Sequence, residues 1–65
     1  MSADLLAEGL VTVADAASYL ALSPKTIWRL MGDGTLPYTR LGRNRRIPRL
    51  ALKSYAAKGL VIGGL

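Results

Sequence analysis

The sequence predicts one small domain that is mainly α-helical and carries a two-stranded β-hairpin. Three features indicate this. Apolar residues recur at helical spacing in two short segments between residues 13 and 31. Two short runs with a two-residue period flank a Gly-Arg-Asn sequence at 42–44. A further helical segment follows Pro48 and ends at Gly59. Helix, turn, helix, hairpin and helix, in this order, make a winged helix-turn-helix.

The chain of 65 residues has room for one domain with a thin core. We assign this domain to residues 10–58. Residues 1–9 form an N-terminal extension or a short helix that ends at Gly9, and Leu10 and Val11 then lie against the core. Residues 59–65 form an apolar tail. Because apolar side chains are unfavourable in water, the tail either lies on the domain's own core or contacts a neighbouring copy.

The first helix is predicted from residue 13 to about residue 20. Thr12 and Asp15 have the spacing of a capping box, with aspartate in place of the more usual glutamate. Asp15 also lies in the first turn of the helix, where the helix dipole favours a negative charge. We therefore assign both residues a structural role.

Ala21 and Leu22 form the turn between the two helices. Glycine is frequent at such a turn because the backbone often adopts a positive φ. Alanine in that conformation costs about 1 kcal/mol. Ser23 then has the position of an N-cap, and Pro24 that of the first residue of a helix that runs to about Asp33.

Apolar residues fall where two short crossing helices must contact each other, at Ala17, Leu20, Leu22, Ile27 and Leu30. Met31 extends this buried stripe. The same periodicity turns Lys25, Thr26, Trp28 and Arg29 away from the core. The second helix is thus predicted to have a basic outer face.

The remaining elements follow from turn signals. Gly32 and Gly34 mark the end of the second helix, with Asp33 in the turn between them. Strands are predicted at residues 38–41, with Thr39 and Leu41 alternating with Tyr38 and Arg40, and at residues 45–47, joined by a tight turn at 42–44. The last helix spans about residues 49–58, with Leu50, Tyr55 and either Leu52 or Ala56 facing inward.

Composition argues against several functions. The chain contains no cysteine and no histidine, which excludes disulfides and thiolate or imidazole metal sites. Its acids are scattered, at Asp4, Glu8, Asp15 and Asp33, and they suggest no carboxylate pair for acid–base chemistry. We therefore expect a protein that is not an enzyme and that needs no metal or cofactor.

Charge is divided unevenly along the chain, which has a formal net charge of +5. Residues 1–24 carry three acids and no base, whereas residues 25–58 carry all nine lysines and arginines and one acid. Such asymmetry favours a polyanionic partner, either nucleic acid or an anionic membrane. No segment is long enough to cross a bilayer, and the N-terminus has acids where a signal peptide has bases. We therefore expect a cytoplasmic protein.

Double-stranded DNA is the partner that this fold favours, because a short helix with a basic face fits the major groove. Arg29 is the best candidate for reading a base, since a guanidinium group can bond guanine O6 and N7 together. Lys25 contacts a phosphate or a base edge, Thr26 a phosphate or a thymine methyl, and Ser23 lies at the helix start. Trp28 either packs between this helix and the hairpin or contacts DNA.

The hairpin can reach the adjacent backbone or the minor groove. Its candidate contacts are Arg40, Gly42, Arg43, Asn44, Arg45 and Arg46. On a regular ribbon Arg43 and Arg45 share one face and Arg46 takes the other, unless the turn introduces a bulge. Arg49 is a secondary phosphate candidate, whereas Lys53 and Lys58 are interpreted as ordinary surface charges.

The motifs together resemble one family. Segments 11–20, 22–30, 34–37, 40–42 and 46–48 are similar to excisionase-type DNA-binding domains, small winged helices related to the MerR-type regulators. The most specific combination is Ser-Pro-Lys-Thr-Ile-Trp-Arg-Leu at 23–30, then Gly-Thr-Leu-Pro at 34–37 and Arg-Leu-Gly at 40–42. On this resemblance Lys25, Thr26 and Arg29 match the recognition helix, and Gly42, Arg43 and Arg46 match the wing. Ala21 departs from the frequent glycine.

The resemblance implies a phage or mobile-element protein that binds repeated sites near an attachment site, bends DNA and directs a tyrosine integrase toward excision. Other copies of the same chain along the DNA are implied partners. A small phage or plasmid transcription regulator would use the same DNA contacts and is the main alternative. Binding to a membrane surface is less consistent, because the bases lie on a helix and a hairpin rather than along one amphipathic helix. RNA offers a deep, narrow groove that fits the helix less well.

Overall fold

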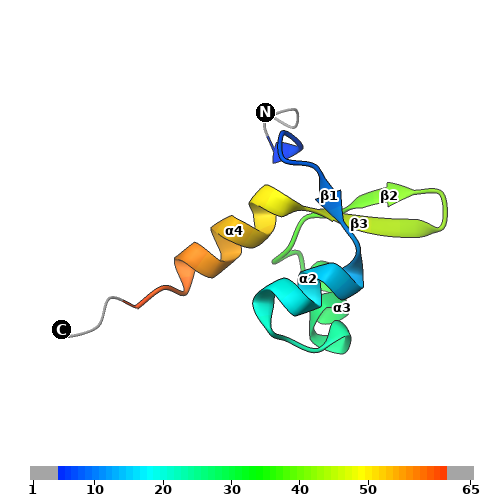
Figure 1. The fold of residues 1–65 in the computed structure, drawn as a ribbon. Coiled ribbons are helices and arrows are strands. Elements are labelled where there is room, and N and C mark those ends of the chain that lie inside the picture. The colour runs from blue at the N-terminus through cyan, green and yellow to red at the C-terminus, as the bar shows by residue number, and fades with distance from the viewer. Residues whose placement is uncertain (1–4, 62–65) are drawn as a thin grey trace.

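The computed structural model describes residues 5–61. The elements are β1 (Leu10–Val11), α2 (Val13–Leu20), α3 (Pro24–Gly32), β2 (Thr39–Leu41), β3 (Asn44–Pro48) and α4 (Arg49–Lys58) (Figure 1). This order confirms the predicted winged helix-turn-helix. The hairpin of β2 and β3 projects from the body on the side opposite to the C-terminal end of α4 (Figure 1). The predicted tail beyond Val61 and the first four residues lie outside the described residues.

The hairpin is built on a two-residue turn. Thr39 pairs with Arg46 and Leu41 with Asn44, which leaves Gly42 and Arg43 between the strands. Gly42 has a φ of 65° at the first turn position, where a type II′ turn requires glycine. The turn is therefore one residue shorter than predicted, and Asn44 belongs to β3 instead of the turn.

A third strand completes the sheet, in the order β1-β3-β2 with both pairs antiparallel. Leu10 pairs with Pro48 and Val11 with Ile47. The Arg49 N–H donates a hydrogen bond of 3.0 Å to the Gly9 carbonyl just beyond this pairing. The position of Leu10 and Val11 against the core was predicted, but two residues are too short for a period-two signal, so the strand itself was not.

The start of α2 has one of the two hydrogen bonds of the predicted capping box. Thr12 accepts a hydrogen bond of 3.0 Å from the Asp15 N–H. At the other end of α2 the Leu22 N–H donates to the Ala17 carbonyl and the Ala21 N–H to the Ser18 carbonyl. These two bonds form a Schellman motif, which places Ala21 at the left-handed position, with φ 56° and ψ 40°. The positive φ at an alanine, considered from the sequence, is thus present.

Replacing Ala21 by glycine should stabilise the domain by up to about 1 kcal/mol, because glycine adopts a left-handed conformation without a steric penalty. The gain is reduced by the greater freedom of glycine in the unfolded chain. Urea unfolding followed by circular dichroism measures the change. Ala57→Gly, an exposed position in α4, is the matched control and should instead destabilise the domain by up to about 1 kcal/mol. Equal destabilisation by both changes would contradict the strain at Ala21.

The core lies between the helices and the inner end of the sheet. Its buried apolar residues are Val11, Ala16, Ala17, Ile27, Leu30, Met31, Leu36, Ile47, Ala51 and Leu52. Leu20 is only partly buried and packs against this cluster. Leu22 was predicted to be buried but is 37% exposed. It follows the left-handed residue, and the reversal of the chain there turns its side chain away from the helix–helix contact.

The assignment of Leu50 to the core also changes. In α4, Ala51 and Leu52 are buried, Tyr55 is partly buried, and Leu50 was predicted to face inward but is only half-buried. The buried face begins at Pro48, the last residue of β3. The direction in which the chain leaves β3 therefore sets how α4 is rotated about its own axis. In β2, Leu41 is 50% exposed because the hairpin extends beyond the body of the domain.

Candidate nucleic-acid interface

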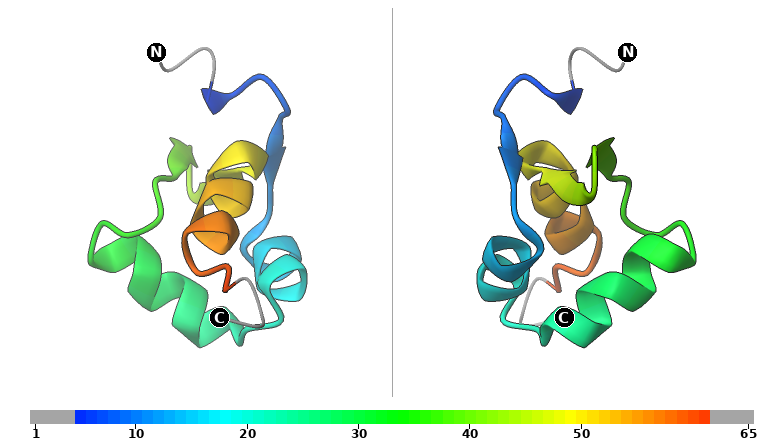
Figure 2. Two further views of the ribbon diagram at one scale, coloured as in Figure 1. Left: turned by 90° about the vertical axis from the view of Figure 1, so that its left-hand side faces the viewer. Right: turned by 90° about the vertical axis from the view of Figure 1, so that its right-hand side faces the viewer.

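The outer face of α3 presents the residues that the sequence assigned to DNA. Lys25, Trp28 and Arg29 are exposed, and Thr26 is half-buried. On the inner face Ile27, Leu30 and Met31 are buried in the core. Helices α2 and α3 diverge from the turn that joins them, which leaves the outer face of α3 at the surface (Figure 2). A stripe of buried residues thus fixes the direction of the basic stripe on the same helix.

Ser23 and Thr26 hold the start of α3. The Thr26 N–H donates to the Ser23 Oγ over 3.2 Å, and the two hydroxyl oxygens lie 2.9 Å apart in a second hydrogen bond. Ser23 therefore acts as the predicted N-cap, with Pro24 in the first turn. The hydroxyl of each residue is oriented by the other, so both are fixed at the positive end of the helix dipole.

Asp33 ends α3. Its Oδ1 accepts a hydrogen bond of 3.0 Å from the Thr35 N–H, which closes an Asx turn. The hydrogen bonds from Thr35 hold the pKa of the Asp33 carboxyl below its ordinary value, and the positive charge of Arg29 acts in the same direction. The carboxylate thus has the structural role that its position between two glycines predicted.

The hairpin separates its arginines onto two faces. Because directly paired residues lie on the same face, Arg40 and Arg45 share the face that continues from buried Ile47. Asn44 and Arg46 lie on the other face, as the period of two predicted for Arg46. Arg43 is exposed within the turn.

Arg45 connects the hairpin to α3. Its guanidinium carbon lies 4.9 Å from the centroid of the Trp28 ring and 5.0 Å from that of Tyr38. Both distances fall within the range of a cation–π interaction. Trp28 is 47% exposed and contacts the hairpin through Arg45, which supports the interpretation that its ring packs between α3 and the hairpin.

The other basic residues differ in what surrounds them. Arg46 is half-buried and its Nη1 donates a hydrogen bond of 3.0 Å to the Arg45 carbonyl. Arg40, Arg43 and Arg49 are exposed. Lys53, interpreted from the sequence as an ordinary surface charge, forms an ion pair of 2.6 Å with Glu8. This pair fastens the N-terminal segment to α4, although an ion pair so exposed contributes little stability.

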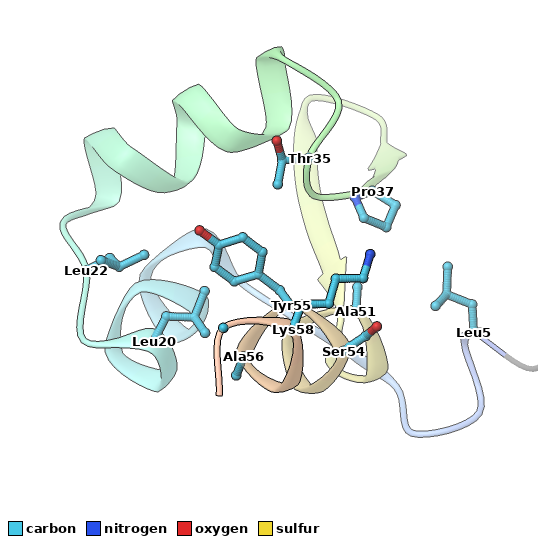
Figure 3. A pocket seen from close by; sticks show the side chains of 11 residues that line it. Leu5, Leu20, Leu22, Thr35, Pro37, Ala51, Ser54, Tyr55, Ala56 and Lys58 are labelled. Carbon is cyan, nitrogen blue, oxygen red and sulfur yellow. The ribbon is translucent and has the colours of Figure 1, made fainter. Parts of the chain in front are cut away.

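A groove of about 740 Å³ lies beside α4, away from the outer face of α3 (Figure 3). Leu20, Leu22, Pro37 and Tyr55 are among the residues that line it. Of the described residues that line it, only Tyr55 and Lys58 are titratable, and they make no acid–base pair. Within residues 5–61 no cluster of three acidic, histidine or cysteine side chains could hold a metal ion. The helices of this part of the chain are too short and too polar to cross a membrane.

Sequence reasoning did not foresee the role of Tyr38. The signal was present, because a two-residue turn at Gly42 sets Arg45 opposite Arg40 and leaves Tyr38 two residues further along the same face. What could not be found from the sequence is that α3 brings Trp28 to the same guanidinium group.

A buried helix pair, a basic outer helix face and an adjoining basic hairpin define a winged helix-turn-helix domain of the DNA-binding class. The chain belongs to the helix-turn-helix domain family, whose match covers residues 10–59. This result and the relatives described next confirm the resemblance to excisionase-type domains.

Two kinds of relative are similar to the chain. A protein of Saccharopolyspora erythraea named "Probable excisionase" is 43% identical over 49 residues, which cover 75% of this chain and 50% of that protein. A protein of Mycobacterium tuberculosis named "Putative DNA-binding protein" is 42% identical over 38 residues, which cover 58% of this chain and 49% of that protein. The chain thus spans about half the length of the curated relatives it matches. No solved structure matches it significantly.

Proposed function

We propose that the domain binds double-stranded DNA with α3 in the major groove and the β2–β3 hairpin on the adjacent backbone or minor groove. The observation that carries this proposal is the contact between Arg45 and Trp28, which joins the outer face of α3 to one face of the hairpin. Two basic elements that are separate in the sequence therefore form one continuous surface. A continuous basic surface of helix and hairpin suits a duplex better than two isolated charge clusters do.

Each element has its own role in the proposal. On α3, Arg29 reads a base edge, Lys25 contacts a phosphate or a nearby base, and Thr26 and Ser23 meet the backbone at the helix start. Trp28 contributes its indole N–H to a phosphate from the edge of this surface. On the hairpin the contacts come from Arg40, Gly42, Arg43, Asn44, Arg45 and Arg46, and Arg49 is a further phosphate contact.

Replacing Arg43 by alanine should weaken binding to all duplexes alike and lower the slope of log K against log salt by about one unit, because one phosphate contact is lost. Fluorescence anisotropy with a labelled duplex at four salt concentrations measures this slope. If the slope of log K against log salt is unchanged, the tip of the hairpin does not contact the DNA backbone. Lys58→Ala removes the same charge from the far end of α4 and serves as the control.

The proposed process is excision of a phage or mobile element. In this proposal the protein binds repeated sites near an attachment site in the bacterial cytoplasm, bends the DNA and directs a tyrosine integrase toward excision. The similarity to the Saccharopolyspora protein supports this choice. The alternative is a small phage or plasmid transcription regulator. The Mycobacterium relatives, whose name states only DNA binding, are equally consistent with it.

Contact between copies of the chain on neighbouring sites is part of the proposal. Leu60 and Val61, the described part of the apolar tail, are 68% and 84% exposed. A single short helix buries too little surface for tight selection of a site, so binding of adjacent copies would supply the missing affinity.

The test is a gel-shift titration with DNA of the host element, in which the attachment region and the neighbouring promoters are separate probes. A ladder of cooperative shifts confined to the attachment region supports the excisionase proposal. Shifts confined to a promoter make the protein a regulator. If neither probe shifts while vesicles of anionic lipid bind the protein in a flotation assay, the DNA proposal is wrong.

A further inference from the structure

The inference concerns Arg45, the hairpin arginine whose surroundings differ most from those of a simple phosphate contact. Arg45 is half-buried, whereas Arg40 and Arg43 on the same hairpin are exposed. Its guanidinium group lies within cation–π distance of two aromatic rings, Trp28 from α3 and Tyr38 from the segment that leads into β2. Since Tyr38 also packs against the hydrophobic core, one of the two rings is anchored in the body of the domain.

We propose that Arg45 is a positioning residue that holds the hairpin at a fixed angle to α3, and that it is not itself a phosphate contact. The proposal rests on the DNA interface described above and changes the role assigned to one of its residues. In this role Arg45 acts through Arg43 and Arg40, whose contacts depend on where the hairpin lies relative to the duplex.

The structure of the hairpin shows why it needs the contact of Arg45 with the two rings, which we call the Arg45 clamp. Strand β2 has three residues, and the hairpin extends beyond the body, so that Leu41 at its outer end is 50% exposed. Beyond Ile47, which is fully buried, the core no longer supports the strands. Arg45 lies two residues further out on the same face. A two-stranded ribbon without such support is only marginally ordered in water.

Arginine suits this position better than lysine does. A planar guanidinium group stacks against two rings at once, whereas an ammonium group is a compact, strongly hydrated charge. The hydrogen bond from Arg46 to the Arg45 carbonyl further fixes the backbone at this residue. Two aromatic side chains, one from α3 and one from the segment before β2, therefore meet at the guanidinium group that β3 carries.

The prediction is that Arg45→Ala weakens binding to a specific duplex by about three- to tenfold. The decisive measurement is made in the Arg40→Ala/Arg43→Ala background, which lacks both arginines through which Arg45 is proposed to act. If Arg45 only positions the hairpin, adding Arg45→Ala to this background should leave the salt slope unchanged, and its loss of affinity should be smaller than in the unmodified protein. If Arg45 contacts a phosphate directly, the added change lowers the slope by about one further unit, which overturns the proposal.

Two conservative variants test the clamp through affinity alone, without the salt dependence. Arg45→Lys keeps the charge but not the stacking, and it should bind almost as weakly as Arg45→Ala. Trp28→Phe keeps an aromatic face and should retain more affinity than Trp28→Ala. Full affinity of Arg45→Lys would show that charge alone matters and would contradict the clamp.

Folding and the proposed DNA function are tested separately. All variants are compared at a temperature where circular dichroism shows them folded, so a loss of affinity does not reflect unfolding. Trp28 is the single tryptophan of the chain, and its fluorescence should change on Arg45→Ala even without DNA. An unchanged spectrum and unchanged binding would overturn the clamp. If the unmodified protein binds no duplex, the proposed function fails, while the fluorescence result still reports on the contact itself.

Discussion

Arg29→Ala is expected to lower affinity for a specific duplex by about 1–3 kcal/mol and to flatten the preference among sequences. The reason is its place on the helix. Arg29 is exposed on α3 between Ile27 and Leu30, both buried, so the core fixes the direction in which its side chain leaves the helix. A bidentate contact to guanine requires such a fixed direction, whereas a phosphate contact tolerates a mobile side chain.

The measurement compares the specific duplex with a set of single-base variants of it, at one salt concentration. The unmodified protein should discriminate among them, and Arg29→Ala should bind the whole set with nearly equal affinity. Lys58→Ala removes one positive charge from the C-terminal end of α4, outside the proposed DNA surface, and should leave the discrimination intact. If Arg29→Ala leaves both affinity and preference unchanged, α3 is not the element that reads the bases.

Local signals in the sequence predicted most of the fold. Ser23 and Pro24 determine where α3 begins, and the Ser23 cap is present with the expected hydrogen bond. Gly42 determined the hairpin turn to within one residue. Such signals are reliable because the interaction that they report lies within a few residues of the chain.

Features that depend on distant segments were not predicted. Strand β1 exists only because β3 offers it a partner, and its two residues carry no pattern of their own. Leu22 has the apolar character of a core residue, but it follows the left-handed Ala21 and lines the groove beside α4 instead of lying in the core. The contact of Arg45 with Trp28 needs the packing of the hairpin beside α3, which no spacing in the sequence encodes. The exposure of Lys25, Trp28 and Arg29 was thus predictable from helical periodicity, whereas the contact that joins α3 to the hairpin was not.

Ile27→Ala is expected to destabilise the domain by about 2–5 kcal/mol, because Ile27 is fully buried and its truncation leaves a cavity between the helices. The free energy of unfolding of a domain of this size is only about 3–5 kcal/mol. The variant should therefore have little stability left, and a substantial fraction of its chains should be unfolded at 25 °C. Circular dichroism in urea measures the loss. Ile27→Val should cost about 0.5–1.5 kcal/mol and remain folded. Leu60→Ala, at a position that is 68% exposed, should change stability by less than about 0.5 kcal/mol.

This loss of stability separates two ways of weakening DNA binding. Ile27 faces the core and touches no partner, so Ile27→Ala lowers affinity only by reducing the folded fraction. A ligand that binds only the folded state restores that fraction, and the stabilisation grows with its concentration relative to its dissociation constant. Raising the concentration of the specific duplex should therefore recover the helical signal of Ile27→Ala together with full sequence preference. The same increase in duplex concentration should saturate the Arg29→Ala variant with DNA but should not restore its preference among DNA sequences. Recovery of helix without preference in Ile27→Ala would show that core packing sets the direction of α3 as well as its stability.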